Sequence, residues 1–242
     1  MYALRLFFVI YEQRFGKEIL GKNGETSDFF WLVLSTVMIA AAGNVINDYF
    51  DIKADRVNRP ERQVVGKQIK RRWAIIIHWS LNLTAFLIAV YLGYRNHTFW
   101  YLFIHLLSIN SLWLYSLYFK KKPVTGNFII AGLTALVPIL CGVHFFIQNS
   151  IIWEDTVTYD SFQYWVNILL EDGKIILILA FFAFFNNFAR EVIKDIEDIE
   201  GDKLIGAKTI PIYFNIGFAK NIAISFLIIP VILFGLLFFF RI

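Results

Sequence analysis

The chain has 242 residues, of which 58% are apolar and 18% aromatic, and its formal net charge is +4. This composition is more apolar than that of a soluble domain of the same length. The single cysteine excludes an intrachain disulfide. The sequence therefore predicts an integral membrane protein.

Seven apolar stretches follow in chain order. The first, Tyr2–Tyr11, is brief and contains Arg5, so we expect a partial span there. The others lack charged residues, and most are long enough for a helix to cross about 30 Å of hydrocarbon. They are Phe29–Asn47, Trp73–Tyr94, Asn96–Phe119, the stretch between Lys122 and Glu154, Ile175–Ala189 and Asn221–Phe240. The pattern predicts an all-α, polytopic transmembrane helical bundle of about seven spans, with residues 1–242 in a single domain.

Charges in the connections predict how the spans are oriented. Lys and Arg are concentrated in Lys53–Arg72, Lys120–Lys122 and Lys194–Lys208, whereas Asn149–Gly173 is acidic. Cytoplasmic loops of membrane proteins are enriched in Lys and Arg. The three basic connections are therefore expected on the cytoplasmic side, with the cell inner membrane as the expected location.

Two acidic clusters lie where apolar stretches end on this side. Asn47, Asp51 and Asp55 recur at every fourth residue, as do Asp198 and Asp202, so each set is expected on one helix face. Like charges at this spacing cost roughly 0.2–0.5 kcal/mol per pair, so a cation should compensate them. Mg2+ takes one or two carboxylates and completes its shell with water and phosphate oxygens. A solvated turn at the membrane surface is the alternative for either cluster alone.

The second cluster extends towards the membrane interior. The helix of Ile175–Ala189 is expected to continue into it, which places Asn187 and Glu191 on the same face as Asp195. We expect Asn187 and Glu191 to line the site, and Arg190 to pair with Glu191 or Asp195.

Basic residues accompany both clusters. Arg59 and Arg62 follow the first one, and Lys120 begins a lysine triplet before a later span. Carboxylates, Mg2+ and converging basic groups together are typical of a polyphosphate site. Orientation of the spans alone is the alternative explanation for these residues.

Longer motifs surround these residues. The first cluster reads Asn47-Asp48-x-x-Asp51-x-x-x-Asp55 and is followed by Arg-Val-Asn-Arg-Pro at 56–60. The second reads Asp198-x-x-x-Asp202 and is followed by Ile-Gly-Ala-Lys-Thr at 205–209. Tyr115, Lys120 and Gly126-Asn127 lie between them. In all of these features the chain resembles the UbiA superfamily of intramembrane prenyltransferases. Because that family usually has nine transmembrane helices, the resemblance implies a chain truncated at its C-terminus.

The resemblance implies transfer of a polyprenyl group from its diphosphate to a lipophilic acceptor, with release of pyrophosphate. It implies a protein surrounded by membrane lipids that binds no nucleic acid. Asp51 and Asp55, assisted by Asn47, would hold one Mg2+, and Asp198 and Asp202 a second. The substrate-binding residues would be Asn47, Asp48, Arg59, Arg62, Tyr115, Lys120, Asn127, Asn187, Glu191 and Asp195.

The nature of the acceptor is less well defined by the sequence. The run from Val192 to Asp202 is most similar to the branch of digeranylgeranylglyceryl phosphate synthases, which favours the hydroxyl of a glycerol-phosphate lipid. Prenylation of 4-hydroxybenzoate or dihydroxynaphthoate in quinone biosynthesis is the alternative, because those relatives have similar metal motifs. A membrane cation transporter is a further hypothesis, since carboxylates within a membrane also bind transported ions.

Three histidines lie within the apolar stretches, at positions 78, 105 and 144. They do not recur at a metal-ligand spacing. We expect each of them to form a hydrogen bond between helices instead.

Overall fold

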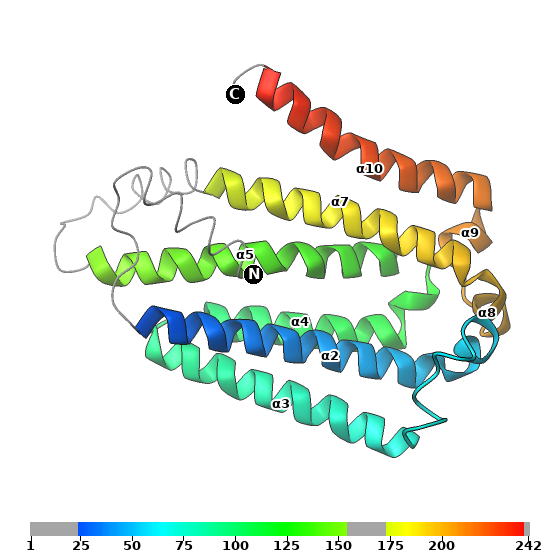
Figure 1. The fold of residues 1–242 in the computed structure, drawn as a ribbon, viewed down its shortest axis with the longest axis horizontal. Helices are drawn as coiled ribbons and strands as arrows, with labels where there is room; N and C mark the ends of the chain where they lie inside the picture. The colour runs from blue at the N-terminus through cyan, green and yellow to red at the C-terminus, as the bar shows by residue number, and fades with distance from the viewer. Residues whose placement is uncertain (1–23, 154–172, 240–242) are drawn as a thin grey trace.

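A computed structural model describes residues 24–153 and 173–239 of the chain. Long helices that run roughly side by side dominate this part of the chain, and no strand occurs in it (Figure 1). The long helices are α2 (Gly24–Asn58), α3 (Arg71–Arg95), α4 (Trp100–Leu117), α5 (Thr125–Trp153), α7 (Gly173–Glu197) and α10 (Ile216–Phe239). The short ones are the 3-10 turn η1 (Phe119–Lys121), α8 (Ile199–Leu204) and α9 (Ile210–Tyr213). The all-α prediction is confirmed.

Five of these helices are long and apolar enough to cross a membrane: α2, α3, α5, α7 and α10. Helix α4 is not among them, because its 18 residues include His105, Ser108 and Asn110. The helix observed within the predicted span Asn96–Phe119 is thus shorter than that stretch, and it is not among the candidate membrane spans. The predicted partial span Tyr2–Tyr11 and most of the acidic connection Asn149–Gly173 lie outside the described residues.

Helix α2 extends well beyond the apolar stretch that predicted it. It continues from Asn47 to Asn58, so the whole first acidic motif is helical. Helix α7 likewise continues to Glu197, as the sequence predicted. Backbone groups in a membrane must be satisfied within the segment, which favours helices that run unbroken to the membrane surface.

The helices pack in two groups, each with its own apolar core. One core joins α2, α3, α4 and α5 through residues such as Leu32, Leu92 and Tyr101. The other joins α5, α7, α9 and α10 through residues such as Phe188 and Ile210. Helix α5 thus belongs to both groups.

Hydrogen bonds from histidines connect neighbouring helices inside the bundle. His78 Nδ1 lies 2.9 Å from the Ala42 carbonyl oxygen of α2, and His105 Nε2 lies 2.8 Å from Ser35 Oγ. His144 Nδ1 lies 2.8 Å from the Tyr101 hydroxyl. The prediction that the three histidines form interhelical hydrogen bonds is confirmed.

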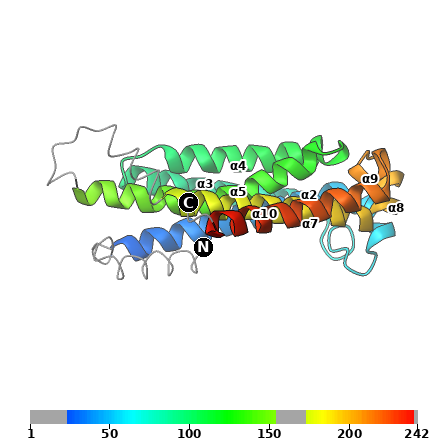
Figure 2. The same ribbon diagram turned by 90° about the horizontal axis from the view of Figure 1, so that it is seen from above.

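One end of the bundle holds α8, α9 and the connection that follows α2 (Figures 1 and 2). Both acidic motifs lie at this end. The two acidic motifs therefore lie at the same end of the bundle, as predicted.

Candidate functional site

A polar cavity of about 160 Å³ lies where α2 meets α8. Helix α2, the connection after it, η1, the end of α7 and α8 supply its walls. Its charged and amide-bearing lining residues are Asn47, Asp48, Asp51, Asp55, Asn58, Arg59, Arg62, Gln63, Lys120, Lys194, Asp198 and Asp202. The cavity thus brings together both acidic motifs and three basic residues that the sequence predicted, Arg59, Arg62 and Lys120.

The first motif lies along the last turns of α2. Asp51 is buried and forms an ion pair with Lys120. Lys120 Nζ also donates a hydrogen bond to Asn47 Oδ1, one turn earlier on the helix, at 3.2 Å. Asp55 lies one turn later and lines the same cavity. The spacing of four therefore places these side chains on one face, as predicted.

The second motif does not lie on one continuous helix with the end of α7. Helix α7 ends at Glu197, and Asp198 is the residue before α8. Asp202 and Asp198 remain one turn apart, because the Asp202 amide donates to the Asp198 carbonyl oxygen at 3.0 Å. The break turns α8 towards α2.

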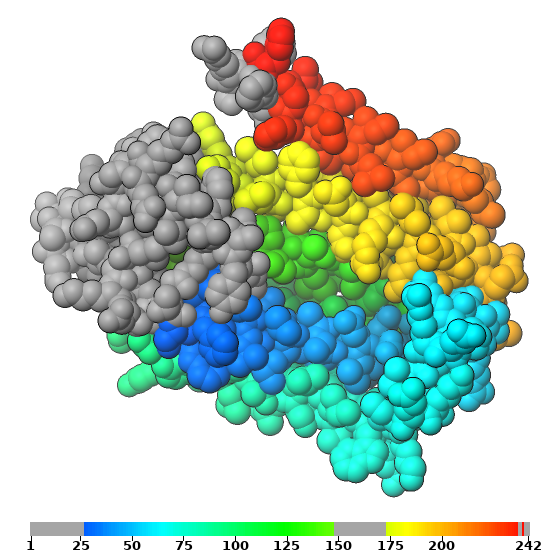
Figure 3. All heavy atoms as spheres, viewed as in Figure 1, coloured from blue at the N-terminus to red at the C-terminus, as the bar shows by residue number. Residues whose placement is uncertain are grey.

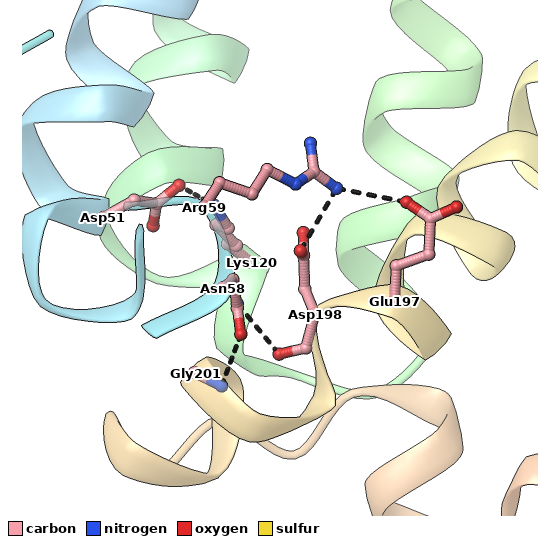
Figure 4. Close-up of polar contacts among 7 residues, drawn as sticks. All are labelled: Asp51, Asn58, Arg59, Lys120, Glu197, Asp198 and Gly201. Atoms are coloured by element: carbon pink, nitrogen blue, oxygen red, sulfur yellow. Dashed lines mark hydrogen bonds and ion pairs between the residues drawn. The ribbon is translucent and has the colours of Figure 1, made fainter. Parts of the chain in front are cut away.

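Two residues after the first motif hold the second motif in place (Figure 4). Asn58 donates from Nδ2 to the Asp198 carbonyl oxygen at 3.1 Å, and its Oδ1 accepts from the Gly201 amide at 2.8 Å. An Arg59 terminal nitrogen lies 3.1 Å from Asp198 Oδ1 and 3.2 Å from Glu197 Oε2. These contacts join the end of α2 to α8.

Gly201 makes this contact between α2 and α8 possible. A Cβ atom at this position would lie 2.4 Å from Asn58 Nδ2 and 2.7 Å from the Ala54 carbonyl oxygen. Such distances are far below ordinary van der Waals contact. Only glycine therefore lets α8 approach the backbone of α2 this closely.

The charges lining the cavity almost balance. The lining includes five carboxylates and four basic side chains, which gives a formal charge of −1. The pKa of Asp202 is raised to about 6, chiefly by burial and also by the Asp198 and Asp51 carboxylates, against the opposing effect of Lys120. Removing Asp202 from water therefore disfavours its ionised form unless a cation compensates it.

Mg2+ fits the donors of this cavity. No group of three or more His, Cys, Asp or Glu side chains in the described part of the chain is arranged to hold a metal ion. The first motif nevertheless offers three carboxylates and the second offers two, and Mg2+ usually takes one or two and completes its shell with water and substrate phosphate. Asp51 and Asp55 would hold one ion and Asp198 and Asp202 another.

A larger cavity of about 400 Å³ extends between α2, α4, α5 and α7, and we call it the chamber. Most of its lining surface is apolar, with contributions from residues such as Ile39, Leu112 and Leu140. Asn47 and Lys194 line both the chamber and the polar cavity, so the two meet there. Atoms of α5 are visible between α2 and α7 in the space-filling view (Figure 3).

Several predicted substrate-binding residues lie away from the polar cavity. Tyr115, Asn187 and Glu191 line the chamber instead. Asn127 donates to Asp195 Oδ2 at 2.8 Å, which connects α5 to α7, and neither residue is among those lining the two cavities. Arg190 pairs with Glu191 at 2.8 Å, which was one of its two predicted partners.

Three contributors to the polar cavity or its assembly were not singled out from the sequence. Asn58 and Gly201 join the two motifs, and Lys194 lines both cavities. Asn58 lies within the Arg-Val-Asn-Arg-Pro stretch and Gly201 directly precedes Asp202. Their position within or beside the two motifs could therefore have identified Asn58 and Gly201 from the sequence.

Comparisons with known proteins identify relatives of this chain. Digeranylgeranylglyceryl phosphate synthase of Thermococcus sibiricus is 35% identical over 192 residues, covering 78% of this chain and 57% of that protein. The enzyme of the same name from Methanobrevibacter smithii is 34% identical over 210 residues, covering 87% of this chain and 66% of that protein. The chain thus spans about three fifths of the length of these curated relatives.

A solved structure shows a similar fold. It is described as digeranylgeranylglyceryl phosphate synthase in membranes, is 25% identical, and matches with a TM-score of 0.54. The match covers 89% of this chain and 66% of that one. The model of the UbiA prenyltransferase family matches residues 19–242. Since this match includes nearly the whole chain, the protein belongs to the UbiA prenyltransferase family.

Proposed function

We propose that the protein transfers a polyprenyl group from its diphosphate to the hydroxyl of a glycerol-phosphate lipid and releases pyrophosphate, with Mg2+ as cofactor. The observation that carries this proposal is the junction of a charged cavity with an apolar chamber at Asn47 and Lys194. A prenyl diphosphate has one charged end and one apolar end, so it matches this pair of cavities. The names of the relatives support the same reaction.

The charges of the polar cavity suit a diphosphate. Two Mg2+ ions would change its formal charge of −1 to +3, which opposes the negative charge of an ionised diphosphate. Arg59, Arg62 and Lys120 line the same cavity and can donate to phosphate oxygens. When bound, Mg2+ would neutralise the charge that develops on the leaving pyrophosphate.

The chain's own residues would then separate the reacting groups from water. Lys120 would hold the diphosphate end beside Asp51, with which it is already paired. The apolar chamber would hold the prenyl chain away from solvent, so that the allylic carbon meets the acceptor rather than water. Both motifs would face the cytoplasm of a cell with this protein in its inner membrane, as the basic connections suggest.

Aromatic prenylation is the second candidate function, because the metal motifs do not distinguish the acceptors. Transport of a cation is less consistent with the fold. The carboxylates lie at the end of α2 and in and just before α8, beside basic residues, whereas transporters bind ions near the middle of the membrane.

Pyrophosphate release by the purified protein tests the proposal. The donor would be geranylgeranyl diphosphate, offered with geranylgeranylglyceryl phosphate or with 4-hydroxybenzoate, in the presence and absence of Mg2+. We expect Mg2+-dependent release with the glycerol-phosphate lipid. Release only with 4-hydroxybenzoate would select aromatic prenylation, and no release with either acceptor would contradict both.

Substitution of the acidic motifs tests the metal assignment. Asp51→Ala and Asp198→Ala should each lower turnover by about 100- to 1,000-fold, the loss seen when a group that stabilises developing charge is removed. Glu200→Ala is a matched control, because the Glu200 side chain is 78% exposed and lines neither cavity. Near-normal turnover in either alanine variant would contradict the assignment.

A further inference from the structure

An ion pair on α7 borders the chamber and takes no part in the polar cavity. An Arg190 terminal nitrogen lies 2.8 Å from Glu191 Oε1. Glu191 is buried, with 8% of its side chain exposed, whereas 70% of the Arg190 side chain is exposed. Both residues line the chamber.

This ion pair contributes little to holding the bundle together. Arg190 and Glu191 are adjacent in one helix, and Arg190 also donates to Asn187 Oδ1 of the same helix, at 3.4 Å. Charged residues in membrane-spanning helices are costly and often serve a function. The cost of burying Glu191 therefore needs an explanation other than helix packing.

The position of the pair places it near the reacting end of the prenyl donor. Lys194, one turn after Arg190 and Glu191 on α7, lines both cavities. The diphosphate would occupy the polar cavity and the chain the chamber, so the bond to be broken would lie close to that junction. Asn187, one turn before Glu191, also lines the chamber, and its buried Nδ2 has no hydrogen-bond partner among the described residues.

We propose that Arg190 and Glu191 form the acceptor subsite, in which Arg190 binds the acceptor's phosphate and Glu191 accepts the proton of its neighbouring hydroxyl. This inference rests on the proposed function. A glycerol phosphate has its phosphate ester and a hydroxyl on adjacent carbons, and the subsite offers a cation and a carboxylate side by side. In 4-hydroxybenzoate the anionic group lies across the ring from the hydroxyl, which fits this spacing less well.

The chemical step balances within the site. The bond between the allylic carbon and the diphosphate oxygen breaks, and pyrophosphate leaves with the electron pair. The acceptor hydroxyl oxygen forms the new ether bond to that carbon, and its proton passes to the Glu191 carboxylate. No oxidant or reductant is needed.

Binding of the acceptor would itself prepare Glu191 for this role. The exposed Arg190 side chain can turn from Glu191 to a phosphate, with which a guanidinium forms bidentate hydrogen bonds. The Glu191 carboxylate would then be left facing the acceptor hydroxyl, from which it can accept a hydrogen bond. The free Nδ2 of Asn187 can donate to the same phosphate or hydroxyl.

A binding experiment without the prenyl donor tests the role of Arg190. The purified protein would be titrated with geranylgeranylglyceryl phosphate and with the same lipid lacking phosphate. We expect the wild type to prefer the phosphorylated lipid by about 10- to 100-fold and Arg190→Gln to lose this preference. Lys174→Gln, an exposed lysine at the other end of α7, is the control with the same charge change. No preference in the wild type, or an intact one in Arg190→Gln, would overturn the proposal.

Kinetics test the role of Glu191. We expect Glu191→Gln to lower the kcat of transfer to the lipid hydroxyl by about 100- to 10,000-fold, with a much smaller change in the KM for the phosphorylated lipid. Glu191→Asp should restore part of the transfer. A kcat close to that of the wild type in Glu191→Gln, or no rescue by Glu191→Asp, would overturn the assignment. If the wild type transfers to no acceptor but still prefers the phosphorylated lipid, the proposed function fails while the phosphate subsite stands.

Discussion

Replacement of Gly201 by alanine is expected to separate the two acidic motifs without removing any charged group. The added Cβ would lie 2.7 Å from the Ala54 carbonyl oxygen, and because this is a backbone atom of α2 it cannot move aside. It would also lie 2.4 Å from Asn58 Nδ2, which forces Asn58 away from the Gly201 amide. Helix α8 would therefore have to withdraw from α2.

The size of the effect follows from these contacts. Overpacking of a close contact costs about 1–3 kcal/mol, and loss of one hydrogen bond about 0.5–1.5 kcal/mol. Together they amount to roughly 2–4 kcal/mol, which corresponds to a change of about 30- to 700-fold in the population of the docked state. Alanine is the better helix former by about 1 kcal/mol, so helix propensity alone predicts the opposite effect.

Pyrophosphate release and the KM for the prenyl diphosphate are the measurements for Gly201→Ala. We expect turnover to fall and this KM to rise, with the protein still inserted in the membrane. Gly132→Ala is the control, because a Cβ at this helical position meets nothing within 4 Å. If Gly201→Ala keeps a KM within about twofold of the wild type, the close contact of α8 with α2 does not govern the site.

Three further predictions concern charge, substrate binding and stability. Burial raises the pKa of Asp202 from 3.8 to about 6, so the metal-free protein should lose stability as the pH rises through this range and the carboxyl ionises. Thermal unfolding measured at several pH values should show this loss, and Asp202→Asn should remove the pH dependence. Lys120→Gln should raise the KM for the prenyl diphosphate by about 10- to 100-fold, because a charged hydrogen bond to phosphate is lost; an unchanged KM in steady-state assays would contradict this. His78→Ala should lower the unfolding free energy by about 1–3 kcal/mol through loss of its contact with Ala42, with little change in KM.

The sequence predicted the acidic faces well because helical spacing is a local property. Asn47, Asp51 and Asp55 could be placed on one face from their spacing alone. The end of the apolar stretch at Asn47 predicted the end of the helix poorly, since α2 continues to Asn58. A charged helix end at the membrane surface does not interrupt backbone hydrogen bonding.

Contacts between distant segments could not be derived in this way. The break after Glu197 depends on how α8 meets α2, and the local pattern gave no sign of it. The same limit applies to Glu191, whose spacing from Asp195 suggested a place beside the acidic motifs. In the structure Glu191 lines the chamber instead. Which side chains of α7 reach the chamber depends on how α7 packs against α5, for example through the hydrogen bond from Asn127 to Asp195.

The junction at Asn47 and Lys194 has a consequence for how the two products would depart. Pyrophosphate would form on the side of the polar cavity, at the end of the bundle where α8 and the basic connections lie. The ether lipid would form on the side of the chamber, among α2, α4, α5 and α7. Each product would then leave towards its own solvent, so that pyrophosphate does not cross hydrocarbon and no prenyl chain enters water.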